Sequence, residues 1–77
     1  MKKLSNVSLD EFRSAMKSFG LTLVRVKGGH EMWAKDGMQR PVVIQTHIDP
    51  LPEFEVRNNI AAAGISKKDF LDMLENL

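Results

Sequence analysis

Two adjacent glycines stand between two runs of β-forming residues, and this arrangement constrains the fold more than any other feature. Residues 21–26 (LTLVRV) are β-formers with a single charge, and residues 30–35 (HEMWAK) also read as a strand. Gly28 and Gly29 tolerate positive φ at little cost, so Lys27-Gly28-Gly29 predicts a tight turn. The sequence therefore predicts two strands joined by a tight turn near the middle of the chain.

Helices are predicted on both sides of these strands. Ser8 and Glu11 fit a capping box at the start of a first helix, and Gly20 is placed to end it. Three further elements are expected: a strand from residue 41 or 42 to about residue 46, a helix over residues 53–63, and a short helix over residues 67–75.

This order predicts an α+β fold. Three antiparallel strands joined by short connections form a sheet, with helices on one face, a free opposite face and a short C-terminal helix. Such an αβββα sandwich resembles the double-stranded-RNA-binding fold. The chain has 77 residues, so we expect one domain over residues 1–77.

The composition narrows the chemistry and the compartment. The chain has no cysteine, which excludes disulfides, thiolate metal sites and a cysteine nucleophile. No apolar run approaches the roughly 20 residues of a membrane-spanning helix. No apolar signal-peptide core follows the basic start of the chain. We therefore expect a cytoplasmic protein that does not enter a membrane.

The segment that carries chemistry is residues 25–30 (RVKGGH), which places two cations and one imidazole around the turn. Lys27 and the backbone amides of Gly28 and Gly29 are suited to hold a phosphate. His30 follows directly, and the imidazole of histidine titrates near neutral pH. RNA carries its own nucleophile, the 2′-hydroxyl, so a protein need only position that group, move protons and stabilise developing charge.

Lys27-Gly28-Gly29-His30 resembles the K-G-S-H turn of the HicA family, the messenger-RNA interferases of bacterial HicAB toxin–antitoxin systems. The similarity covers nearly the whole chain, with two departures: Gly29 stands where the family usually has serine, and residues 49–54 differ from the family's usual connection. The other matching features are Phe19-Gly20 at the end of the first helix, Trp33 three residues after the histidine, residues 42–44 (VVI) running toward His47, Arg57, and residues 60–65 (IAAAGI).

The resemblance implies a metal-independent endoribonuclease toxin that cleaves mRNA. His30 would be the general acid or base, with Lys27 and the amides of Gly28 and Gly29 holding the phosphate. A HicB-like antitoxin would neutralise the toxin by covering His30 or by blocking the access of RNA. Two alternatives keep the same fold: a non-catalytic RNA-binding module, which the Gly29 departure favours, and a protein-interaction domain.

Further cations are expected to contact phosphates. Residues 1–40 hold eight Lys/Arg against four Asp/Glu, whereas residues 41–77 hold three against six. The more basic half is the better surface for phosphates. Arg25, Lys27, Lys35 and Arg40 are interpreted as a cluster on two adjoining turns, of which Arg25 and Lys35 join Lys27 as candidate RNA contacts.

Two residues admit more than one role. His47 ends the third strand, where a structural role is favoured and an auxiliary role in catalysis stays open. The two histidines lack zinc-ligand spacing, so neither a metal nor a cofactor is predicted. Trp33 is either a base-stacking platform or a core residue, and burial of its large ring favours the core. That choice leaves His30, Met32 and Ala34 on the free face of the sheet, whereas the alternative buries them.

Overall fold

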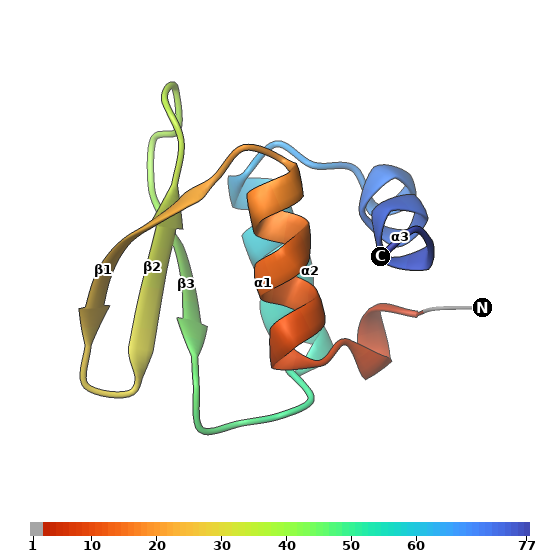
Figure 1. Cartoon of the computed structure of the whole chain (residues 1–77), viewed down its shortest axis with the longest axis horizontal. Coiled ribbons are helices and arrows are strands. Elements are labelled where there is room, and N and C mark those ends of the chain that lie inside the picture. Colours follow the sequence, from red (N-terminus) through yellow and green to blue (C-terminus); the bar gives the residue numbers. More distant parts are fainter. Residues whose placement is uncertain (1–2) are drawn as a thin grey trace.

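A computed structural model describes residues 3–77 and confirms the αβββα order, with three antiparallel strands in the order β1-β2-β3 (Figure 1). The predicted ends of the strands and of the last two helices lie within one residue of the observed ends. The elements are the 3-10 helix η1 (Leu4–Asn6), α1 (Leu9–Ser18), β1 (Thr22–Lys27), β2 (His30–Ala34), β3 (Val42–Gln45), α2 (Glu53–Ala62) and α3 (Lys67–Glu75).

Helix α1 begins at the predicted capping box. The Ser8 hydroxyl accepts from the Glu11 N–H at 3.1 Å, and the Glu11 carboxylate accepts from the Ser8 N–H at 2.9 Å. Asp49, in the loop before α2, adds an acceptor that the sequence did not indicate: its Oδ1 accepts from the Leu9 N–H at 3.0 Å. A carboxylate is favourable at this positive end of the helix dipole. The loop is therefore fastened to the start of α1.

The core lies between the sheet and helices α1 and α2. Trp33 on β2 is only 2% exposed, and Val42 and Ile44 of β3 are fully buried beside it. Because successive side chains of a strand point to opposite faces, His30 and Met32 lie on the other face. Met32 is half-buried and His30 is exposed. The predicted parity of β2 is confirmed.

Helix α3 forms a further layer on the side of α1 and α2 away from the sheet (Figure 1). The rings of Phe12 on α1 and Phe70 on α3 are both fully buried, with centroids 5.8 Å apart. The Ser66 hydroxyl caps α3 by accepting from the Asp69 N–H at 3.1 Å. Helix α3 therefore packs on the other helices, and it does not cover the outer face of the sheet.

A charged network lies at the edge of this core. The Glu31 carboxylate accepts from Arg13 Nε at 3.0 Å and from Arg13 Nη2 at 2.6 Å. It also accepts from the Trp33 indole N–H at 3.1 Å. The guanidinium of Arg13 holds the pKa of Glu31 below its ordinary value of 4.5, with a further contribution from the Trp33 N–H. The network fixes the indole and joins α1 to the middle strand.

We expect Glu31→Gln to flatten the acid dependence of stability. A lowered pKa in the folded state contributes stability that is present above the unfolded-state pKa and is lost as the pH falls. The wild-type melting temperature should therefore drop below about pH 4.5, whereas the variant should lose less over that range. At neutral pH the variant should be about 1–2 kcal/mol less stable, because its bonds to Arg13 lose their charge.

Thermal unfolding followed by circular dichroism between pH 3 and 7 measures both effects. Glu75→Gln, at an exposed position near the end of the last helix, is the matched control. An equal drop of melting temperature in wild type and Glu31→Gln on acidification would contradict this role for Glu31.

Candidate functional site

The turn that carries the predicted site is a two-residue hairpin loop. Gly28 has φ +57°, whereas Gly29 has no positive φ, a pattern that matches a hairpin turn with glycine in its first central position. Lys27 and His30 pair directly across the turn. Directly opposed residues share one face of a sheet, with Cβ atoms about 5 Å apart. The structure thus brings the predicted lysine and histidine together.

Two rows of side chains cross the outer face of the sheet. Lys27, His30 and Gln45 stand opposite one another on the three strands, and they form the row nearest the hairpin turn. Arg25, Met32 and Val43 form the adjacent row. Arg25 and Lys27 are exposed and lie on the edge strand β1, whereas His30 lies on the middle strand β2. The outer face of the sheet is therefore positively charged along the β1 edge. Gln45 was not among the residues predicted for the site.

The imidazole of His47 lies beside the turn, against Gly29. Thr46 donates from its N–H at 2.8 Å and from its hydroxyl at 3.1 Å to the Gly29 carbonyl. This holds the chain after β3 against the turn. A Cβ atom built on Gly29 would lie 3.2 Å from His47 Nδ1. The glycine that departs from the K-G-S-H pattern is therefore the residue against which the second imidazole packs.

Helix α2 is attached along the outer edge of β3 by side chains that bond to the strand's backbone. Asn59 accepts from the Val43 N–H at 3.3 Å and donates to the Val43 carbonyl at 2.9 Å. Glu55, one turn earlier, accepts from the Gln45 N–H at 3.1 Å. Each such bond contributes about 1 kcal/mol net, and more with a charged partner. These two side chains take the place of a fourth strand.

A groove of about 330 Å³ runs between β3 and α2, and His30 forms one of its walls. The other walls carry an exposed phenylalanine, two residues of the loop before α2, and amide and carboxylate groups of β3 and α2. The lining residues are His30, Val43, Gln45, Ile48, Pro52, Phe54, Glu55, Asn58 and Asn59. Local sequence patterns hardly indicate this groove, because it depends on contacts between segments ten or more residues apart.

The prediction that the two basic turns adjoin is wrong. An antiparallel strand has its two turns at opposite ends, and Figure 1 shows this for β2. Lys35 lies about 16 Å along the strand from His30 at about 3.3 Å per residue. Its ammonium donates to the Phe19 carbonyl at the end of α1, at 3.3 Å. Lys35 therefore stabilises a helix C-terminus and lies far from the imidazole, as does Arg40 beyond it.

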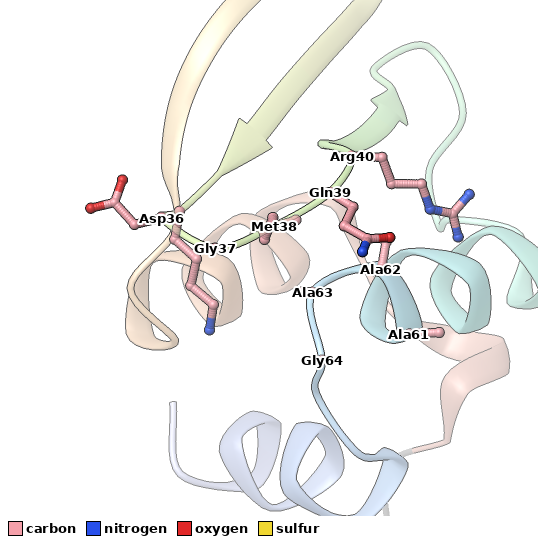
Figure 2. A pocket seen from close by; sticks show the side chains of 10 residues that line it. Asp36, Gly37, Met38, Gln39, Arg40, Ala61, Ala62, Ala63 and Gly64 are labelled. Atoms are coloured by element: carbon pink, nitrogen blue, oxygen red, sulfur yellow. The ribbon is translucent and has the colours of Figure 1, made fainter.

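A larger cavity of about 730 Å³ lies at that far end, between residues 35–40 and the end of α2. Figure 2 shows Asp36 pointing away from this space and Gln39 reaching toward the end of α2 near Ala62. The α2 side is formed by Ala61 to Gly64, which bring no reactive side chain. The groove lined by His30 is therefore the better candidate site despite its smaller volume, because it holds an imidazole, a carboxylate and side-chain amides.

Two other classes of site have no basis in residues 3–77. No three His, Asp or Glu side chains of this part gather closely enough to hold a metal ion. No helix within it is both long and apolar enough to span a membrane. Comparison of the chain with models of protein families, with curated proteins and with solved structures gave no match.

Proposed function

We propose that this protein is a metal-independent endoribonuclease of the cytoplasm, a HicA-like toxin that cleaves mRNA. The observation that carries the proposal is the row of Lys27, His30 and Gln45 across the free face of the sheet, next to a glycine turn. A phosphate at this row is met by a lysine, by the nearby amides of the turn and by an imidazole. These are the groups that cleavage by the 2′-hydroxyl requires.

The chemistry needs two proton transfers. The 2′-oxygen attacks phosphorus and loses its proton, while the bond from phosphorus to the 5′-oxygen breaks and that oxygen gains a proton. The products are a 2′,3′-cyclic phosphate and a 5′-hydroxyl. His30 performs one of these transfers, and Lys27 stabilises the charge on the phosphorane. The second transfer falls to water or to His47, whose ring packs against Gly29 beside His30.

We expect His30→Ala to abolish cleavage and toxicity while leaving the melting temperature nearly unchanged, because the imidazole is exposed and lies on the free face. His47→Ala should slow cleavage less, since its role is auxiliary. The measurement is the cleavage rate of labelled single-stranded RNA in EDTA, with the ends of the products identified.

Thermal unfolding of both variants is the control for folding. Undiminished cutting by His30→Ala would contradict the assignment of His30. Activity that disappears in EDTA and returns with magnesium would contradict the metal-independent reaction.

The cations of β1 make a separate prediction. Arg25→Gln combined with Lys27→Gln should weaken RNA binding and flatten its salt dependence, because removing one phosphate contact lowers the slope of log K against log salt by about 0.7 for a single strand. Lys35→Gln is the matched control, since Lys35 lies at the far end of β2. The assignment fails if the double variant and the control keep the wild-type slope.

We further propose that a HicB-like antitoxin pairs with the free edge of β1. Side chains of α2 occupy the β3 edge, whereas β1 has no strand on its outer side within residues 3–77. Leu23, Val24 and Val26 are 45%, 58% and 61% exposed, an unusual concentration of apolar surface on an edge strand. Arg25 and Lys27 beside them favour an acidic segment added as a further strand. Such a partner would cover the cations that hold RNA.

This partner site is tested with Val26→Lys. A lysine on an edge strand opposes the addition of another strand, so the affinity for an antitoxin encoded beside this chain should fall at least about tenfold, with RNA cleavage retained. Leu77→Lys, at a similarly exposed apolar residue, is the control. Equal affinities of the two variants in calorimetric titration would show that the partner binds elsewhere.

A further inference from the structure

We propose that the groove between β3 and α2 binds a nucleobase of the RNA, next to the phosphate that is cut. The proposal rests on the ribonuclease function above and adds to it a base-binding site. Its residues, Phe54, Asn58, Gln45 and Glu55, were not among those predicted from the sequence. They lie on the side of His30 opposite to the basic strand β1.

Phe54 is the stacking group of this site. It is in the first turn of α2 and is 68% exposed, the highest value among the large exposed apolar side chains of residues 3–77. Such exposure of an aromatic ring in a groove is costly in water unless a partner covers it. Nucleobases stack on aromatic side chains, and one such contact accounts for a large share of the affinity for single strands.

The polar groups around the ring suit the edge of a base. The side-chain amides of Gln45 and Asn58 both line the groove, and neither makes a hydrogen bond within residues 3–77. Glu55 uses Oε1 to accept from the Gln45 N–H, which leaves its other oxygen as an acceptor. Together these groups offer both donors and acceptors, as the Watson–Crick edge of an unpaired base requires.

The distribution of charge indicates which side of His30 receives the phosphate of a nucleotide and which side receives its base. Arg25 and Lys27 lie on β1, on one side of His30, whereas the carboxylate of Glu55 lines the groove on the other side. Phosphates are attracted to the first side and repelled from the second. A nucleotide across the sheet therefore places its phosphate at the row of Lys27 and His30 and its neutral base in the groove.

The experiment measures stacking directly. In a His30→Ala background, which prevents cutting, short single-stranded RNAs carry 2-aminopurine or an abasic site at one position at a time. We expect the fluorescence to be quenched at a particular position, and the abasic site to weaken binding most at that position. Phe54→Ala should remove the quenching and weaken binding about five- to 150-fold, whereas Phe54→Trp should retain both. Leu77→Ala, with a side chain 57% exposed, is the control.

The outcomes separate this inference from the proposed function. If, in the His30→Ala background, the Phe54→Ala variant binds RNA and quenches the fluorescence as strongly as the Leu77→Ala variant, the base site is overturned even where His30 proves catalytic. It is equally overturned if Phe54→Ala impairs only the binding of a partner protein. If the wild type never cuts RNA but quenching depends on Phe54, the base site stands and the cleavage proposal fails. Normal melting temperatures for the variants exclude unfolding as the cause.

Discussion

The attachment of α2 to the edge of β3 determines the rest of the functional surface. Asn59 pairs with both backbone groups of Val43, as a residue of a neighbouring strand would. One helical turn earlier, the Glu55 carboxylate accepts a hydrogen bond from the Gln45 N–H in the same way. With these bonds, a three-stranded sheet has one closed edge and one open edge. The closed edge forms a groove with His30 in its wall, and the open edge presents the cations of β1.

The same attachment also sets the position of α2 relative to His30 and the glycine turn. Because Glu55 holds the backbone of Gln45, and Gln45 pairs with His30, the first turn of α2 is fixed relative to the imidazole. Thr46, the residue after Gln45, holds the Gly29 carbonyl through two hydrogen bonds. Together with the pairing of Lys27 and His30 on the β1 side, these contacts hold the backbone that carries the exposed histidine, and a fixed position is what a group that transfers protons requires.

Local patterns in the sequence were sufficient to predict the elements and their order. The paired glycines, the Ser8 capping box and the burial of Trp33 each depend on residues a few positions apart, and all three are confirmed. The pairing of Lys27 with His30 follows from the hairpin for the same reason. The interpretation of the two basic turns as adjoining was wrong, because turns alternate between the ends of an antiparallel sheet.

Contacts between distant segments could not be predicted from such local patterns. Asn59 lies 16 residues from Val43, and a helical asparagine has many polar partners open to it. Phe54 was missed because an aromatic residue at the start of a helix is ordinarily expected to face the core.

Gly29, which stands where the K-G-S-H turn has serine, contacts the ring of His47 in the structure. A serine at this position would place its Cβ 3.2 Å from His47 Nδ1, a distance at which the ring has to move. With glycine, the imidazole of His47 packs directly on the backbone of the turn. Under the proposed function, the imidazole of His47 takes the place of the hydroxyl that glycine lacks. For the proposed ribonuclease, the departure from K-G-S-H at Gly29 therefore does not by itself argue for a non-catalytic module, because an imidazole packs on the same turn.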